Sequence, residues 1–175
     1  MHATGHAEVF LGYDRDTGYA EAAMADLPGE IRALISRMDG EQPLWSDDGK
    51  LLVKSLKSTD LGVAFLLEFE GKKIYHAGDL FLMPARTRED VKEFEQYTEP
   101  LRGMKIDYGM LPLDPRFPDI GYLTVRRYLE LAEFTAWTPM HLWGQYDFPA
   151  AFAAENPSLA QHMCALKAGE RMDLE

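Results

Sequence analysis

The sequence has a single cysteine and an excess of acidic over basic side chains. Cys164 is the only cysteine in 175 residues, so the chain can form no internal disulfide and no cysteine-rich zinc cage. A lone cysteine fits a reducing compartment. Lys and Arg number 18 against 29 Asp and Glu, which gives a formal net charge of -11. This charge argues against a nucleic-acid or anionic membrane partner and leaves a small-molecule substrate open.

Long apolar runs are also absent from the sequence. No stretch approaches the length of a membrane-spanning helix, and the first ten residues, MHATGHAEVF, lack the basic and apolar regions of a signal peptide. We therefore expect a cytoplasmic protein. The 46% hydrophobic content and 11% aromatic content favour a globular fold over disorder, and a chain of 175 residues is most simply one domain.

A run of turn-forming residues, GEQPLWSDDGK at positions 40–50, separates two parts of different character. Residues 1–49 form an atypical N-terminal segment that is rich in helix-forming residues. Within it, Ile31, Leu34, Ile35 and Met38 recur at helical spacing, which predicts a helix with this apolar stripe in the core. Residues 50–175 form the second part of the single domain.

Strand and helix patterns alternate after residue 50. The predicted elements are strands at 51–58, 62–70 and 72–77, a helix at 87–100, a strand at 106–114, a helix at 121–134, a strand at 136–144 and a final helix. Such alternation favours a sheet with helices packed against it, in an α/β or mixed α+β layered domain.

The stretch GKKIYHAGDL, residues 71–80, combines a turn glycine, a short strand and the sequence His-Ala-Gly-Asp. The preceding run GVAFLLEFE predicts a hairpin that turns at Gly71. The second strand of this hairpin then ends at Gly78, and Asp79 projects from its end, a place where functional residues are common. The alternative interpretation is that Asp79 only caps a turn.

A second strand end carries His141, in TPMHLWG. Together with HAGD, the hairpin before it and IDYGMLPLD, this motif resembles the C-terminal half of a metallo-β-lactamase-fold hydrolase, over residues 51–148. The resemblance implies an α+β fold, an αββα sandwich. It also implies a shortened or partial version, because the HxHxDH motif of the family's first half does not occur in this sequence.

The resemblance further implies a metal site. Asp79 matches the aspartate that bridges two metal ions, and His141 matches the last histidine ligand. Asp60 stands in STD, where many relatives have a further histidine; it either supplies an oxygen ligand, which would favour manganese over zinc, or caps the strand. Zinc, manganese or iron would suit these ligands, and a bound divalent ion would activate water for hydrolysis.

The other histidines have less defined roles. His2 and His6 form an HxxxH pair that could supply missing ligands, although exposed histidines near a chain terminus are the simpler interpretation. His76 lies inside an alternating strand and is expected in the core or behind the ligands rather than among them. His162, beside Met163 and Cys164, is interpreted as structural.

Several residues near the two strand ends have both a structural and a functional interpretation. Asp114, in PLDPRFPD, either lines the mouth of the site or caps a turn. Four aromatic residues lie close to His141 in the sequence. They form either the wall of a pocket or part of the core: Trp137, Trp143, Tyr146 and Phe148.

Two functions follow from these features. The first is a metal-dependent hydrolase, with Asp79 and His141 as catalytic metal ligands, acting on a small ester, lactone or phosphodiester. The alternative is a non-catalytic remnant of the same fold that serves as a binding or assembly module. Because a shortened first half would leave a sheet face without cover, we also expect a two-fold homodimer.

Overall fold

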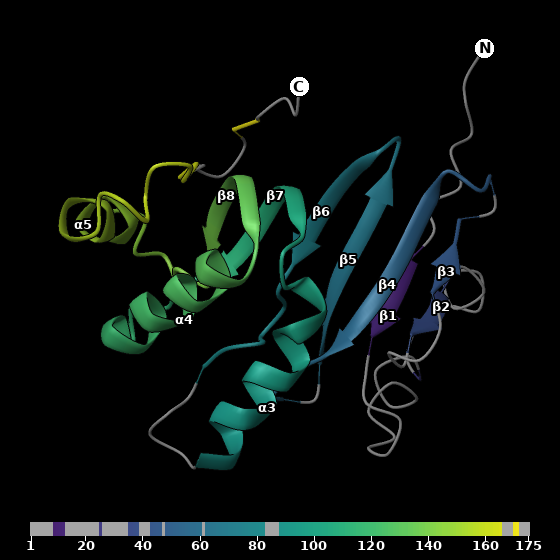
Figure 1. Ribbon diagram of the computed structural model, residues 1–175, viewed down its shortest axis with the longest axis horizontal. Coiled ribbons are helices and arrows are strands. Elements are labelled where there is room, and N and C mark those ends of the chain that lie inside the picture. The colour runs from purple at the N-terminus through teal and green to yellow at the C-terminus, as the bar shows by residue number, and fades with distance from the viewer. Residues whose placement is uncertain are drawn as a thin grey trace.

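The computed structural model describes residues 9–12, 25, 35–38, 43–46, 48–60, 62–82, 88–165, 170 and 171. Within these ranges the main element is a six-stranded sheet with the strand order β3-β4-β5-β6-β7-β8 (Figure 1). The strands are β3 (Leu44–Trp45), β4 (Leu51–Lys57), β5 (Val63–Phe69), β6 (Lys72–His76), β7 (Lys105–Pro112) and β8 (Glu133–Met140).

The first half of this sheet is antiparallel and the second half is parallel. Strands β3 to β6 pair in antiparallel fashion through short turns. Strand β6 pairs in parallel with β7, and β7 pairs in parallel with β8. Parallel neighbours need a crossover connection, and helices supply both crossovers. The alternating apolar pattern of residues 51–76 and the glycine at Gly71, which has φ +81, explain the tight hairpin.

The helices lie against the sheet (Figure 1). They are α3 (Arg88–Thr98) with the short 3-10 helix η2 (Glu99–Leu101), α4 (Pro118–Leu131) and α5 (Phe148–Glu155). Helices α3 and α4 connect successive parallel strands in the same direction across the sheet, so right-handed crossovers place both on one face. The predicted order of elements after residue 50 and the α+β class are confirmed.

The core lies between this face and the helices. Its fully buried side chains include Tyr75 on β6, Phe94 on α3 and Tyr128 on α4. The Tyr75 hydroxyl donates to the Tyr128 hydroxyl at 3.3 Å, and the latter donates to the backbone oxygen of Leu80 at 2.8 Å. Buried hydroxyls need such partners. The contact ties the segment after β6, which carries Asp79, to helix α4.

Two boundaries differ from the sequence-based expectation. The helix predicted to reach residue 134 ends at Leu131, and the strand predicted to begin at 136 begins at Glu133. Ala132 is already extended, with φ -134 and ψ 154, and Phe134 pairs with Ile106 of β7. An apolar residue in a helical pattern has therefore been taken into the sheet, because pairing and burial outweigh local helix propensity.

The helix predicted around Ile35 and Met38 is wrong for the part that the structure describes. These residues lie in β2 (Ile35–Met38), which pairs in parallel with β1 (Val9–Gly12) in a separate two-stranded sheet. A four-residue segment with one β-branched residue fits either period, so the spacing alone cannot decide between helix and strand. Ile31 and Leu34 lie outside the described residues.

The outer edge of β8 is covered by the segment that follows α5. The backbone N–H of Trp137 donates to the oxygen of His162 at 2.9 Å, and the N–H of Cys164 donates to the oxygen of Trp137 at 2.7 Å. Trp137 and Met163 form an isolated parallel bridge. Among the described residues, no helix is both long and apolar enough to cross a membrane.

We expect Gly78→Ala to destabilise the fold more than Gly103→Ala. Both glycines have positive φ, +58 and +70, which costs a side-chain-bearing residue about 1–2 kcal/mol. At Gly78 an added Cβ would also lie 2.5 Å from the backbone oxygen of Val63, whereas the space at Gly103 is open. Urea denaturation should give a loss of about 3 kcal/mol for Gly78→Ala. Equal losses for the two variants would contradict this packing argument.

Candidate functional site

The predicted pair of residues meets at one edge of the sheet. Asp79 follows the end of β6 and His141 follows the end of β8, and these ends lie at the same edge because β6, β7 and β8 are parallel. The Nε2 atom of His141 lies 3.2 Å from Oδ1 of Asp79. The Asp79 side chain is 67% exposed and that of His141 is 28% exposed. The pair is therefore accessible to a small molecule.

The turn that presents Asp79 is held from both sides. Gly78 adopts φ +58 and lies against the backbone of Val63, and its N–H donates to Nδ1 of His76 at 3.0 Å. The next residue, Leu80, is fully buried, and its N–H donates to the oxygen of Ala77 at 3.1 Å. The HAGD sequence thus forms a tight turn in which the small residues permit close backbone approach and Asp79 projects outward.

His76 lies behind this turn, and its burial favours the neutral form of the imidazole. Burial is the main cause that lowers the pKa of His76 below its ordinary value of 6.5, and the neighbouring His141 lowers it further. A backbone hydrogen bond, followed by the charge of Asp79, acts in the opposite direction. Because Nδ1 accepts the Gly78 N–H, the neutral ring carries its proton on Nε2. The sequence-based expectation that His76 lies behind the pair agrees with this position.

Three residues of the loop that presents His141 have backbone φ angles in the left-handed region. His141 has φ 60, Trp143 has φ 51 and Gly144 has φ 81. For His141 and Trp143 such a conformation costs about 1–3 kcal/mol each and persists only where surrounding contacts enforce it. Local strain at a residue that also meets a carboxylate is typical of functional sites.

Asp60 is in the turn between β4 and β5, and its carboxylate is engaged there. Oδ1 accepts the N–H of Gly62 at 3.0 Å, which closes the turn. The structure thus shows the capping contact, the second of the two sequence interpretations. It does not join Asp60 to Asp79 and His141, and its role as a metal ligand stays a prediction. His2 and His6 lie outside the described residues.

Asp114, at the end of β7, is both a turn residue and part of this edge. Its Oδ1 accepts the backbone N–H of Arg116 at 2.8 Å, and its Oδ2 accepts Nη2 of Arg116 at 2.6 Å. Trp143 Nε1 also donates to Oδ2, at 3.2 Å. Burial alone would raise the pKa of Asp114, but the hydrogen bonds from Arg116, followed by that from Trp143, lower it below its ordinary value of 3.8.

Arg116 also belongs to this edge, and no sequence motif predicted it. Its guanidinium carbon lies 3.9 Å from the centre of the Trp143 ring, so the side chain is held between a carboxylate and an aromatic face. Such a cation–π contact contributes about 0.5–1 kcal/mol at an exposed position. The signal available in the sequence was the short spacing of Asp and Arg in LDPR, which is common in turns and therefore unspecific.

The aromatic residues around His141 divide between core and surface. Trp137 is fully buried and Phe148 packs at the edge of the core, as the core interpretation predicts. Trp143 and Tyr146 are exposed by 63% and 56%. They flank the loop and do not close a pocket over His141 in any contact that the described residues show.

The donor set at this edge is compatible in type with a divalent transition metal, and it is incomplete in number. Asp79 offers carboxylate oxygen and His141 offers imidazole nitrogen, both suited to zinc or manganese. Within the part of the chain that the structure describes, no group of three metal-competent side chains forms. A protein zinc site uses three or four side-chain ligands. Asp79 and His141 therefore account for a part of such a site, and further donors would have to be water or residues outside the described ranges.

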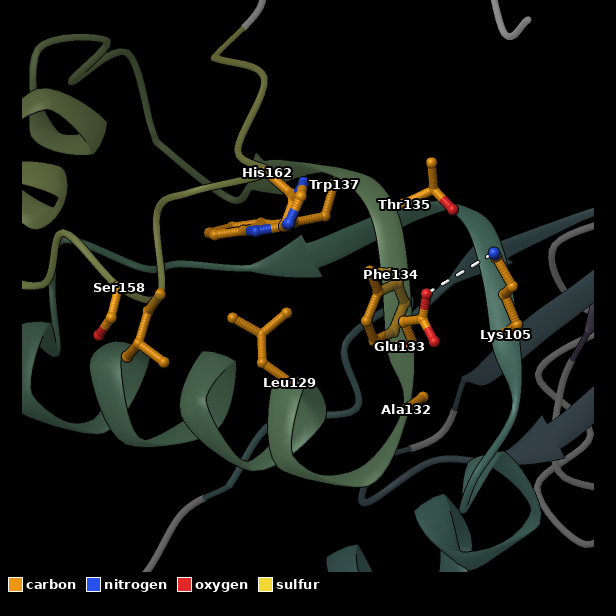
Figure 2. Close-up of a pocket in the computed structure, with 10 residues that line it drawn as sticks. Lys105, Leu129, Ala132, Glu133, Phe134, Thr135, Trp137, Ser158 and His162 are labelled. Carbon is orange, nitrogen blue, oxygen red and sulfur yellow. Dashed lines mark ion pairs between the residues drawn. The ribbon is translucent and has the colours of Figure 1, made fainter.

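A pocket of about 400 Å³ lies elsewhere, at the opposite ends of β7 and β8 (Figure 2). Lys105, from the start of β7, faces Glu133, from the start of β8, with their charged atoms 3.7 Å apart. His162 lies beside Trp137 in this view. The pocket lining includes neither Asp79 nor His141, so this cavity is separate from the predicted site.

Comparisons by sequence find no match, and comparisons by structure find distant likenesses. No protein-family model matches the sequence, and no curated protein is significantly similar to it. A candidate Zn-dependent hydrolase of the metallo-β-lactamase superfamily from Thermotoga maritima is 23% identical with a TM-score of 0.41, over 61% of this chain and 49% of that one.

Two further solved structures are similar to this chain. The metallo-β-lactamase fold protein YhfI from Bacillus subtilis is 13% identical with a TM-score of 0.47, over 80% of this chain and 55% of that one. A mutant of the CmlA β-hydroxylase is 13% identical with a TM-score of 0.46, over 78% and 31%. The chain thus spans between 31% and 55% of the length of these proteins. Two of the three are proteins of the metallo-β-lactamase superfamily or fold.

We expect acid to destabilise the metal-free protein through His76. Since the pKa of His76 is lowered in the folded state, the unfolded chain binds more protons at this residue between the lowered value and the ordinary 6.5. The free energy of unfolding therefore falls as the pH falls through this window. Urea denaturation at pH 8 and pH 5 should show a smaller acid-induced loss for His76→Gln than for wild type.

The matched control for this measurement is His162→Gln, because His162 is exposed. This variant should lose as much stability on acidification as the wild type does. A His76→Gln variant with the wild-type pH dependence would show that His76 does not carry the effect.

Proposed function

We propose that the protein is a metal-dependent hydrolase that acts on an ester, lactone or phosphodiester at the edge formed by Asp79 and His141. The single observation that supports this is the 3.2 Å approach of the two side chains, which come from separate strand ends and meet where three parallel strands terminate. Substrate sites in open sheets commonly lie at such carboxyl ends.

In this proposal Asp79 and His141 bind the divalent ion. When bound, such an ion supplies Lewis-acid polarisation of the substrate and lowers the pKa of water. The exposed carboxylate of Asp79 offers a second oxygen beside the one near His141. His76 holds the Gly78 N–H and thereby keeps the turn that aims Asp79. Zinc and manganese are both compatible with one oxygen and one nitrogen donor; an oxygen from Asp60 would favour manganese.

A second candidate is a non-catalytic binding or assembly module. The observation in its favour is the sheet face opposite the helix-packed core. Leu67, Ile74 and Met110 lie on this face, on the neighbouring strands β5, β6 and β7. All three are apolar and half-buried, and none belongs to the core cluster that packs against the helices. Such a face is suited to a partner surface.

We expect metal binding to depend on both residues of the pair. Protein purified without chelator and then incubated with zinc or manganese should retain the metal after gel filtration. Asp79→Ala and His141→Ala should each reduce the bound metal to background, because each variant removes a direct ligand. His162→Ala is the control, since this exposed histidine lines the separate pocket, which includes neither Asp79 nor His141. Metal retention by the Asp79→Ala variant would place the ion elsewhere, and no metal on the wild type would favour the binding module.

We expect hydrolysis to rank the variants in a fixed order. Asp79→Ala should abolish activity on generic ester and phosphodiester substrates, whereas His76→Ala should reduce it by about 10–100-fold, because His76 acts only on the turn behind the pair. Chelation should abolish the wild-type activity and added zinc or manganese should restore it. Activity that survives both chelation and Asp79→Ala would have another origin.

The predicted two-fold homodimer is compatible with both of these functions. A second copy packing on the half-exposed sheet face would bury Leu67 and Ile74. Light scattering on the isolated chain should give twice the monomer mass, and Ile74→Glu should return the monomer, because a charge in an apolar interface is costly. A wild-type chain that is monomeric at high concentration would remove the dimer.

A further inference from the structure

Few backbone interactions stabilise the observed conformation of the loop 141–144. Its left-handed residues His141 and Trp143 disfavour the observed conformation. Backbone hydrogen bonds tie the loop at both ends, from Leu113 N to Met140 O at 3.1 Å and from Gln145 N to Leu142 O at 2.8 Å. Between these two bonds, side-chain contacts must supply the restraint.

Burial of Trp143 does not supply that restraint. The Trp143 side chain, which stands in the middle of the loop, is 63% exposed. Its position is instead defined by two directional contacts, the Nε1 hydrogen bond to Asp114 at 3.2 Å and the stacking of its ring with the Arg116 guanidinium at 3.9 Å. These two contacts define the orientation of the exposed indole, which burial alone would not do.

The partners of Trp143 are joined to each other by hydrogen bonds. Asp114 is 5% exposed and lies two residues after the end of β7. Arg116 is bound to both of its carboxylate oxygens, with Nε at 3.0 and 3.1 Å and Nη2 at 2.6 Å. A bidentate arginine–carboxylate pair has a defined planar geometry. The charge of Asp79 acts on Arg116 as well, after the larger effect of Asp114, and helps to raise the pKa of Arg116.

We propose that Asp114, Arg116 and Trp143 form a positioning clamp that keeps His141 in its left-handed conformation with Nε2 directed at Asp79. The contacts connect the segment that follows β7 to the loop that follows β8, beyond the last paired residues of the two strands. These three residues act on His141 and do not themselves touch a reacting atom. The proposal rests on the proposed function only for the role of His141 in metal binding.

The test uses the imidazole nitrogens of His141 in the metal-free protein. Because Nε2 lies 3.2 Å from Asp79, the neutral ring should carry its proton on Nε2 and show one defined tautomer in long-range proton–nitrogen spectra at pH 8. Trp143→Ala and Arg116→Gln should both convert this signature into that of mixed tautomers. His141→Gln assigns the signal by its loss.

Matched variants separate the clamp from a general effect. Trp45→Ala removes an indole that is 60% exposed on β3, and Arg127→Gln removes an arginine that is paired with Glu130 on α4. Both should leave the His141 signature unchanged. Trp143→Phe keeps the ring against Arg116 and loses the hydrogen bond to Asp114, so an intermediate signature is expected. This variant also carries the test if Trp143→Ala unfolds.

Zinc titration by calorimetry gives the second readout. The clamp variants should raise the zinc dissociation constant by about 10–100-fold relative to wild type, which is the range for residues that orient a ligand. If Trp143→Ala and Arg116→Gln both keep the single-tautomer spectrum of His141, the clamp proposal is wrong. A wild type that binds no zinc would overturn the metal-dependent function, while the imidazole spectra still decide the clamp.

Discussion

Parallel pairing of β6, β7 and β8 is the constraint on which the arrangement of the site depends. The register places His76 beside Met110 and Pro112 beside Met140, so the three strands end at nearly the same level. Residues that follow these ends, Asp79, Asp114 and His141, are thereby brought to one edge although long helical connections separate them in sequence. A change of register would move each carboxylate or imidazole away from the others.

The backbone around this edge is restrained more strongly than the exposed side chains suggest. Gly78 has no room for a side chain, and Tyr128 holds the oxygen of Leu80 from within the core. His141 is presented by a strained loop whose exposed tryptophan is tied to the end of β7. The sheet and core thus supply the rigidity, and the loops use it to hold conformations that they would not adopt alone.

The sequence predicted the element order after residue 50 because period-two alternation, turn glycines and long amphipathic segments are strong local signals. It also predicted that Asp79 and His141 come together, through motif resemblance rather than through any local pattern. It failed at residues 35–38, where a short segment fits both periods, and at 132–134, where sheet pairing overrides helix propensity.

The role of Arg116 could not be predicted from the sequence for a different reason. Its contact with Trp143 joins two loops whose distance depends on the finished sheet, so no local pattern encodes it. Asp60 illustrates the same limit, since the sequence leaves both a turn and a ligand open, and only the folded structure shows that the carboxylate accepts the N–H of Gly62.

The two ends of the six-stranded sheet bear on how copies of this protein can meet. At one end β3 has only two residues, and at the other the segment around Met163 occupies backbone groups of Trp137 on β8. Short or covered border strands give little template for continuous cross-chain β-pairing. Cross-chain β-pairing is therefore obstructed at Trp137 on the β8 border, where the protein's own chain already occupies the backbone groups.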